Sequence, residues 1–350
     1  MKAIQLVAHG NPGRFEMREL PEPGPRADEV VVQVQACGLN HLDLWLEQGG
    51  LPMPLQLPRT PGCEVAGRIL ATGPGVTGWK PGDSVVVQSN IFCGRCEYCR
   101  KGQESFCLAP LMLGVQVDGG FAEQVCVPQR ALVRLPPELD FQGAACLSLA
   151  GSTAMHMLTD RTTVSPEDWV LVIGAGSGVG SAAIQIARGL GAQVIATGST
   201  EAKRRLGQQL GAQHVVDSTA TDWPAEVRKL TAKRGVAVVV EHVGGPVLLQ
   251  AFECLARGGT VVTCGATAGR EVPLNLWAFF VKQHRLVGSY SRNAADLRRT
   301  LEWAAAGKLK PVLHAVYPLD RTPEAFAALH SRSVAGKIVV EPFEGDAGQD

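Results

Sequence analysis

The segment "VLVIGAGSGVG", residues 170–180, restricts the possible folds of this chain more than any other stretch. Four apolar residues lead directly into a turn in which alternate positions are glycine: Gly174, Gly176, Gly178 and Gly180. Bare backbone can approach a phosphate group closely, and a helix that follows would present its N-terminus to the same anion. We therefore interpret the segment as a phosphate-binding turn between a buried strand and a helix, in preference to a plain structural turn.

The residues after this turn continue the pattern of a parallel sheet. Short apolar runs, "WVLVI", "QVIAT", "HVV", "VAVVV", "TVVTC" and "RLVGS", alternate with segments of helical period such as "GSAAIQIARGLG" and "EAKRRLGQQLG". This alternation predicts a doubly wound dinucleotide-binding domain over residues 146–291. The candidate cofactor-binding residues in its turn are Gly174, Gly176, Ser177, Gly178, Val179 and Gly180.

The remainder of the chain predicts a second, mostly β domain. Residues 1–145 hold short β-like runs separated by Pro and Gly turns, among them "EVVVQVQACG", "VAGRILATG" and "FAEQVCVP". After residue 291 a helical segment, "ADLRRTLEWAAAGKLK", and a strand, "AGKIVVEP", are expected to complete this domain. The final "EGDAGQD" is expected to be frayed. The prediction is an α/β protein of two domains.

The end of the second strand of the dinucleotide-binding domain indicates which dinucleotide is bound. An acidic side chain there usually holds the free ribose 2′-hydroxyl of NAD. This chain instead has Thr197, Gly198, Ser199 and Thr200, followed by Lys203, Arg204 and Arg205. Hydroxyl and basic groups suit a 2′-phosphate, so we predict NADP, with NADPH preferred over NADH. A solvated basic helix face would explain the same residues.

A second concentration of reactive side chains lies in "CGRCEYCRKGQESFC", residues 93–107. Its short spacings allow Cys93, Cys96, Cys99 and Cys107 to close a thiolate tetrahedron around one zinc ion per chain. Four unrelated buried thiols are a poor alternative, because a polar, charged loop offers them no core to fill. Four protein ligands leave no open position, so this zinc is predicted to be structural.

Composition excludes several classes of partner. The 350 residues carry 33 basic and 33 acidic side chains without basic clusters, so we expect neither nucleic acid nor a membrane as partner. "MKAIQLVAHG" leads into no apolar signal region, and no apolar run is long enough to span a bilayer. With 10 cysteines, too few for a disulfide scaffold, we expect a cytoplasmic protein with a small-molecule substrate.

Together these motifs resemble those of the medium-chain dehydrogenase/reductase superfamily, which contains zinc alcohol dehydrogenases and NADPH-quinone oxidoreductases. The likeness rests on "ACGLNHLDL", "PGCEVAGRILATGPGV", "KPGDSVVV", the cysteine lobe, "DGGFAEQVCVP" and the glycine turn, in the family's order and spacing. It implies a GroES-like catalytic domain, residues 1–145 and 292–350, with the zinc lobe at 93–107, and a Rossmann domain, residues 146–291.

The resemblance also implies a homodimer or homotetramer. Its subunits would join near "VPLNLWAFFVKQHRLVGSY", residues 272–290, which is apolar enough to need covering. The alternative is that Trp277, Phe279 and Phe280 form the buried face of a helix within one chain.

The resemblance further indicates that ligands of a catalytic zinc are missing. In the alcohol dehydrogenases a Cys, a His and a second Cys hold that ion, and the matching positions here are Asn40, Cys63 and Leu149. Leucine cannot bind a metal, and Cys63 with Glu64 are too few ligands for tight zinc binding. We therefore expect metal-free chemistry, with Cys63 filling a small cavity and Glu64 paired with a basic group that the sequence does not identify.

Without a Lewis acid, the expected reaction is hydride transfer to an electron-poor acceptor. Quinones and α,β-unsaturated carbonyls need only hydrogen-bond donors for the charge that develops on their oxygen. The resemblance makes Asn40 and His41 candidate donors, although Asn40 would equally cap the helix "HLDLWLEQG". Many relatives carry Tyr where this chain has Trp45, which cannot give up a proton. We expect Trp45, Phe92 and Leu149 to line an apolar wall and solvent to supply the proton.

Two alternatives stay open. A zinc alcohol dehydrogenase would recruit Cys37 or Cys146 beside Cys63 and Glu64, and each chain would then hold a second zinc ion. A non-catalytic nucleotide-binding protein would keep the glycine turn but reduce no acceptor. Metal content tests the first alternative, and a panel of quinones and enals tests the second.

Overall fold

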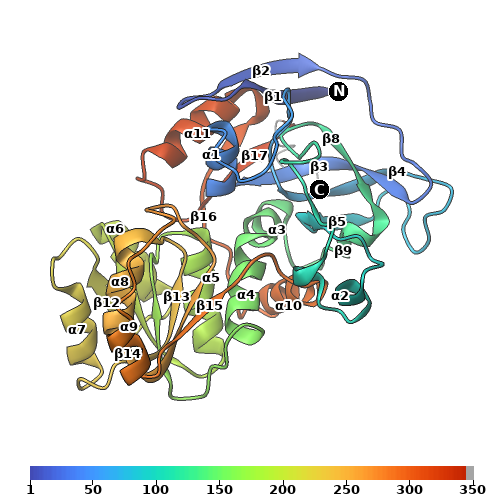
Figure 1. Ribbon diagram of the computed structural model, residues 1–350. Helices are drawn as coiled ribbons and strands as arrows, with labels where there is room; N and C mark the ends of the chain where they lie inside the picture. Colours follow the sequence, from blue (N-terminus) through green and yellow to red (C-terminus); the bar gives the residue numbers. More distant parts are fainter. Residues whose placement is uncertain (344–350) are drawn as a thin grey trace. The chain divides into compact units, whose positions relative to one another are not determined.

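The structure is a computed structural model that describes residues 1–343, and it divides into two compact units (Figure 1). Unit 1 comprises Met1–Leu149, Asn293–Ala305 and the chain from Pro311 onward. Unit 2 comprises Ala150–Arg292 and Ala306–Lys310. The "EGDAGQD" tail, residues 344–350, lies outside the described residues.

Within residues 1–343, unit 1 is built on a seven-stranded sheet with the order β16-β17-β3-β4-β5-β9, in which β8 also pairs with β3. Its strands are β3 (Glu29–Leu39), β4 (Glu64–Thr72), β5 (Ser84–Val87), β8 (Gln124–Pro128), β9 (Leu132–Arg134), β16 (Leu313–Pro318) and β17 (Lys337–Glu341). Two small ladders accompany the sheet: β1 (Lys2–Ala8) with β2 (Arg14–Glu19), and β6 (Asn90–Ile91) with β7 (Leu111–Met112).

Alternating apolar side chains make β3 the central strand of this sheet. Val30, Val32 and Val34 face one hydrophobic core, as the period of two requires. The pairing of β3 with β4 shifts register between Val34 and Ala36, and Ala36 belongs to a second core that includes residues of α3 (Phe141–Leu147). The predicted run "EVVVQVQACG" is therefore a strand with both faces buried. The other helices of unit 1 are α1 (His41–Glu47), α2 (Glu97–Arg100), α10 (Ala294–Ala305) and α11 (Thr322–His330), with 3₁₀ turns at Glu104–Phe106, Gln129–Ala131 and Leu319–Arg321.

Unit 2, all of whose residues are described, contains a six-stranded parallel sheet in the order β12-β11-β10-β13-β14-β15. The strands are β10 (Trp169–Val172), β11 (Gln193–Gly198), β12 (His214–Asp217), β13 (Val236–Glu241), β14 (Leu255–Thr263) and β15 (Arg285–Gly288). They coincide with the six predicted apolar runs, and their order is that of a doubly wound dinucleotide-binding fold. The predicted fold class is confirmed.

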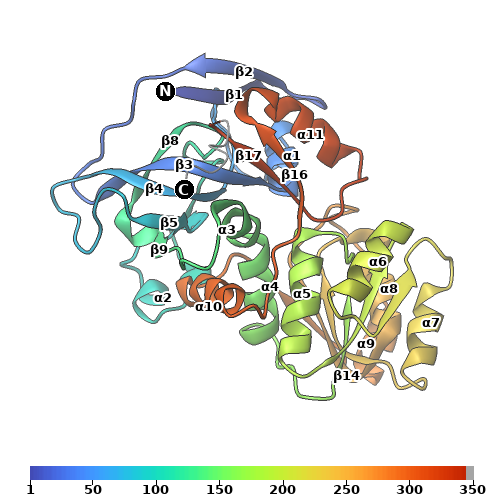
Figure 2. The same ribbon diagram turned by 180° about the vertical axis from the view of Figure 1, so that it is seen from behind.

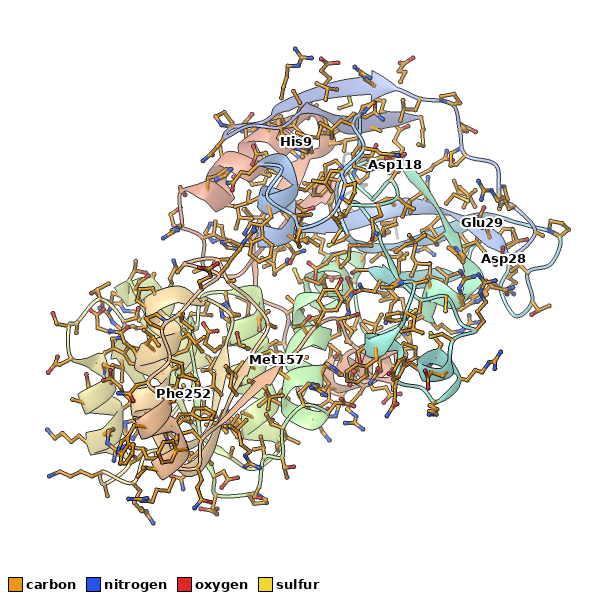
Figure 3. All side chains as sticks on the ribbon, viewed as in Figure 1. His9, Asp28, Glu29, Asp118, Met157 and Phe252 are labelled. Carbon is orange, nitrogen blue, oxygen red and sulfur yellow. The ribbon has the colours of Figure 1, made fainter. Side chains whose placement is uncertain are left out.

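Helices cover both faces of the unit 2 sheet (Figures 1 and 2). One face carries α4 (Ala150–Thr159), α5 (Gly178–Gly189) and α6 (Glu201–Gln209), and the other carries α7 (Trp223–Leu230), α8 (Gly245–Cys254) and α9 (Leu276–Val281). Met157 and Phe252, labelled in Figure 3, are buried side chains of α4 and α8. Among the described residues, no helix has both the length and the apolar character needed to cross a bilayer.

The apolar stretch around α9 is partly core and partly surface. Phe279 packs against the core of unit 2, with its ring centroid 5.8 Å from that of Phe252. Trp277 and Phe280 are 72% and 56% exposed. The interpretation of all three aromatic residues as a buried helix face is therefore wrong for Trp277 and Phe280 and holds only in part for Phe279, which is partly buried.

Candidate functional site

The four-cysteine lobe brings its sulfur atoms together. The Sγ atoms of Cys93, Cys96, Cys99 and Cys107 all lie within 4.8 Å of one another. The Cys96 amide donates to Cys93 Sγ at 3.4 Å, and the Cys93 amide donates to Cys107 Sγ at 3.3 Å. Backbone N–H groups of Cys99 and Leu108 lower the pKa of Cys96 to about 6, because they stabilise its thiolate. The donor set and spacing fit one tetrahedral zinc ion.

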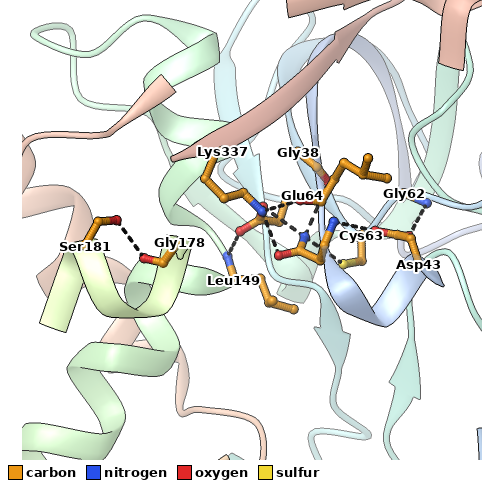
Figure 4. A network of polar contacts seen from close by, with 11 residues as sticks. Gly38, Asp43, Gly62, Cys63, Glu64, Leu149, Gly178, Ser181 and Lys337 are labelled. Atoms are coloured by element: carbon orange, nitrogen blue, oxygen red, sulfur yellow. Dashed lines mark hydrogen bonds and ion pairs between the residues drawn. The ribbon is translucent and has the colours of Figure 1, made fainter. Parts of the chain in front are cut away.

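A second cluster is built around Glu64, where the neighbouring strands β17, β3 and β4 meet α1. Lys337 Nζ lies 2.5 Å from Glu64 Oε2, 2.7 Å from Asn40 Oδ1 and 2.6 Å from Leu39 O (Figure 4). Lys337 is 5% exposed and Glu64 0%. Each proton of the ammonium group thus has its own acceptor. Lys337 is the basic partner of Glu64 that sequence reasoning did not identify.

Asn40 connects this ion pair to Cys63. Its Nδ2 donates to Glu64 Oε2 at 3.0 Å and lies 3.8 Å from Cys63 Sγ. Asn40 is also the N-cap residue of α1, and its backbone N–H donates to the Asp43 carboxylate at 2.8 Å. The structure therefore brings Asn40, Cys63 and Glu64 together in one buried polar cluster.

Asp43 connects the segment at Asn40 with the segment at Gly62 through hydrogen bonds, and the sequence analysis gave it no role. Its buried carboxylate accepts hydrogen bonds from the backbone N–H groups of Asn40, at 2.8 Å, and Gly62, at 3.2 Å. Burial raises the pKa of Asp43 to about 7, since desolvation outweighs these two hydrogen bonds. The predicted donor His41, by contrast, is exposed at the first position of α1.

The glycine turn of unit 2 lies at the carboxyl end of β10. Gly174 has a φ of 73°, a conformation that favours glycine, and Ser177 caps α5 by accepting a hydrogen bond from the Gly180 amide at 2.8 Å. A Cβ atom on Gly180 would lie 2.1 Å from the Gly174 oxygen. Gly178 and Val179 begin α5. This bare turn at a helix N-terminus fits the pyrophosphate of the predicted dinucleotide.

The end of β11 has no acidic side chain. Gly198 is its last residue, and the exposed Ser199 and Thr200 follow. Thr200 caps α6 by accepting a hydrogen bond from the Lys203 amide at 3.3 Å. The Lys203 side chain borders the glycine turn, because a Cβ atom on Gly176 would come within 2.6 Å of Lys203 Cγ. Two predicted cofactor segments are thus in contact.

Arg204 and Arg205 both have acidic partners. Arg204 pairs with Asp217 at 2.8 Å and donates to the Gly198 oxygen at 3.2 Å, while Arg205 pairs with Glu201 on α6. Asp217 ends β12 opposite Gly198, and hydrogen bonds from Thr219 keep the pKa of Asp217 below its ordinary value. Arg204 therefore lies at the end of β11 with part of its charge balanced by Asp217.

Comparison with known proteins identifies the family. The alcohol dehydrogenase GroES-like domain family matches residues 26–137, and the zinc-binding dehydrogenase family matches residues 178–306. An alcohol dehydrogenase of Geobacillus stearothermophilus is 33% identical over 343 residues, which cover 97% of this chain and 99% of that protein. The protein is a medium-chain dehydrogenase/reductase.

Two further relatives of this medium-chain dehydrogenase/reductase differ in the activity for which they are named. The crystal structure of an NAD-dependent alcohol dehydrogenase matches it with a TM-score of 0.95 and 40% identity, over 98% of this chain and 100% of the other. The acryloyl-coenzyme A reductase of Sulfurisphaera tokodaii is 31% identical over 343 residues, 98% of this chain and 100% of that protein. The chain is therefore an oxidoreductase with a nicotinamide cofactor, and its four-cysteine lobe supports zinc binding.

The three positions that the family resemblance assigns to a catalytic zinc, Asn40, Cys63 and Leu149, offer one thiol among them in this medium-chain dehydrogenase/reductase. The backbone N–H of Leu149 donates to Glu64 Oε1 at 2.7 Å, and its apolar side chain offers no ligand atom. Within residues 1–343, the lobe cysteines are the one group of three or more His, Cys, Asp or Glu side chains that could hold a metal ion. Cys37 or Cys146 with Cys63 and Glu64 therefore forms no such group. Burial also raises the pKa of Cys146 to about 12.

Proposed function

We propose that this enzyme transfers hydride from NADPH to a quinone or an α,β-unsaturated carbonyl, without a metal on the acceptor oxygen. The observation that carries the proposal is the Lys337 ammonium, 2.5 Å from Glu64. A catalytic zinc needs about three protein ligands and one open position. Here the carboxylate of Glu64 is already paired with Lys337. A metal cation bound beside it would be repelled by the Lys337 ammonium group, which three acceptors hold in place.

The proposed acceptors need little help from the protein. Conjugation lets the β-carbon accept hydride while the charge spreads onto the carbonyl oxygen, where hydrogen-bond donors stabilise it. The resemblance to an acryloyl-coenzyme A reductase supports this class, because an acryloyl thioester is itself α,β-unsaturated. When bound, the nicotinamide supplies the hydride; the chain binds and orients both partners.

The hydrogen-bond donor to the acceptor oxygen is part of the same proposal. Asn40 Nδ2 lies 3.0 Å from Glu64 Oε2, 3.4 Å from the Gly38 oxygen and 3.8 Å from Cys63 Sγ. Its two N–H groups already face acceptors in the cluster, so Asn40 would serve the acceptor oxygen only by giving up one of these contacts. His41 is exposed, which supports a role at the solvent side of the loop, with solvent as the source of the proton.

The preference for NADPH rests on the end of β11. Gly198 offers no carboxylate to a 2′-hydroxyl, and the hydroxyls of Ser199 and Thr200 with the basic Lys203 and Arg204 suit a 2′-phosphate. The relative named as an NAD-dependent alcohol dehydrogenase favours NADH instead. Fluorescence titration with each reduced dinucleotide decides between them: tighter binding of NADPH is expected, and equal or tighter binding of NADH contradicts this preference.

Alcohol oxidation is the second candidate, favoured by the names of the relatives. Metal analysis separates the two functions. The reductase is expected to hold one zinc ion per chain and to reduce a panel of quinones and enals after treatment with a chelator that leaves the lobe zinc in place. A second zinc ion per chain, together with alcohol oxidation that the chelator abolishes, would support the alcohol dehydrogenase. Failure to oxidise either dinucleotide with every acceptor would support a non-catalytic nucleotide-binding protein.

We also propose a homodimer, or a tetramer built from it, joined along β15. This strand is at one edge of the unit 2 sheet, and Trp277 and Phe280 on nearby α9 are exposed. Light scattering should show a dimer or tetramer that dissociates in Trp277→Asp and persists in Met17→Asp, a control with an exposed apolar residue on β2. A monomeric parent protein contradicts the proposal.

We also propose a cytoplasmic location, since none of the 10 cysteines, all of which lie within residues 1–343, forms a disulfide.

A further inference from the structure

His242 follows β13 and contacts the glycine turn. Its Nε2 lies 2.9 Å from the Ile173 oxygen and 3.0 Å from Ser177 Oγ. Ile173 is the last residue before Gly174, and Ser177 is the N-cap of α5. One ring nitrogen of His242 therefore contacts both ends of the turn.

The hydrogen bonds determine which form of the imidazole is present. Ser177 Oγ donates its single proton to the Gly174 oxygen at 2.9 Å and accepts from the Gly180 amide at 2.8 Å. The Ile173 oxygen can only accept. Nε2 of His242 must therefore carry the hydrogen that is shared between the Ile173 oxygen and Ser177 Oγ. Burial lowers the pKa of His242, which keeps the ring neutral near pH 7.

The surroundings hold the His242 ring against the turn. A Cβ atom on Gly174 would come 3.3 Å from His242 Cε1, so the imidazole packs against the bare face of that glycine. The preceding Glu241 is fully buried, and its Oε1 accepts hydrogen bonds from the amides of Val243, at 2.5 Å, and Gly244, at 2.6 Å. This carboxylate fixes the backbone on the far side of His242, so the ring has a defined direction.

We propose that His242 is a positioning residue for the dinucleotide: its Nε2–H holds the glycine turn and the first turn of α5 in the conformation that receives the pyrophosphate. The proposal rests on the family's use of a nicotinamide dinucleotide and is independent of the acceptor. Without the N–H, Ser177 loses one of its two donors and the Ile173 oxygen loses its side-chain partner. The turn would then sample conformations with lower phosphate affinity, while the adenosine pocket is not touched.

Three ligands and three variants test this role. His242→Leu removes the N–H, His242→Gln keeps an N–H donor at a similar distance from Cα, and His214→Leu is a matched control at an exposed position of β12. Dissociation constants are measured for NADPH by fluorescence, and for ADP-ribose and adenosine by calorimetry. In His242→Leu we expect about 10-fold weaker binding of NADPH and ADP-ribose, roughly the effect of one hydrogen bond, and unchanged binding of adenosine, which carries no phosphate. His242→Gln should recover most of the affinity, and His214→Leu should bind all three ligands like the parent.

Two results overturn the proposal: unchanged affinity of His242→Leu for ADP-ribose, or an equal loss for adenosine, which would indicate general damage to unit 2. If His242→Leu does not fold, His242→Gln and Ser177→Ala replace it. Ser177→Ala should then weaken the binding of ADP-ribose but not of adenosine, and failure to do so counts against the role of the turn. Because no acceptor is present in these titrations, their failure leaves the proposed reductase activity standing.

Discussion

Replacing Lys337 with Met should destabilise unit 1 by several kilocalories per mole. The substitution keeps the length and the apolar stem of the side chain but removes the ammonium group that contacts Glu64, Asn40 and the Leu39 oxygen. Glu64 is fully buried and would lose its ammonium partner while it keeps the hydrogen bonds from the Asn40 and Leu149 N–H groups. Removal of one member of a buried ion pair costs about 3–5 kcal/mol, because the other charge stays buried and unpaired.

Hydrogen exchange localises this effect. Since about 1.4 kcal/mol is tenfold in an equilibrium, amides of β3 and β4 that exchange by opening of unit 1 should do so about a hundred-fold to a few thousand-fold faster in Lys337→Met. Amides of β11 in unit 2 serve as the internal control. The double variant Lys337→Met/Glu64→Gln should recover much of the loss, because no unpaired charge is left. A single variant that exchanges within a few-fold of the parent would refute the view of a closed, internally neutralised cluster.

Three further predictions concern other parts of unit 1. Cys99→Ser should lower the zinc content from one ion per chain toward none by metal analysis, because three thiolates bind zinc less tightly than four. Burial raises the pKa of Asp43 from an ordinary 3.8 to about 7. The stability that protonated Asp43 contributes is therefore fully present below pH 3.8 and is lost as the pH rises through about 7. Asp43→Asn should therefore flatten the fall in unfolding free energy across that window in urea titrations. Gln88, 2% exposed, has no hydrogen-bond partner for either side-chain amide atom among residues 1–343, so Gln88→Met should raise the unfolding free energy by about 1 kcal/mol; a loss of stability would contradict this.

Most of the fold could be predicted because its signals are local. The six strands of unit 2 are short apolar runs with β-branched residues, and each is followed by a helical segment or a turn. The glycine turn could also be predicted, because the contact that requires a glycine is local. A Cβ atom on Gly180 would clash with the Gly174 oxygen of the same turn. The α9 region was harder, because the pattern of Trp277, Phe279 and Phe280 does not show which ring faces the core.

Only those parts of the candidate site that lie close together in the sequence could be predicted. The cysteine lobe spans 15 positions of one loop, so spacing alone suggested its ligands. Lys337, by contrast, lies 297 positions from Asn40 and reaches it only because β17 pairs with β3. Nothing near "AGKIVVEP" marks its lysine as buried, and a strand that begins with Lys ordinarily turns that residue to solvent. His242 was missed in the same way, because its contacts with Ile173 and Ser177 depend on the pairing of β13 with β10.

The charge balance of the Glu64 cluster bears directly on the proposed reaction. At about 4 Å and an effective dielectric constant of roughly 20, two unit charges interact by about 4 kcal/mol, so a divalent ion beside Lys337 would be opposed by roughly twice that. Glu64 attracts such an ion less than a free carboxylate would, because its Oε2 already accepts from Lys337 and Asn40 and its Oε1 from Leu149. The ammonium itself has no proton left for an acceptor oxygen. On the proposed reaction the Glu64–Lys337 ion pair therefore does not polarise the acceptor, and the substrate's own conjugation has to make its carbon electrophilic.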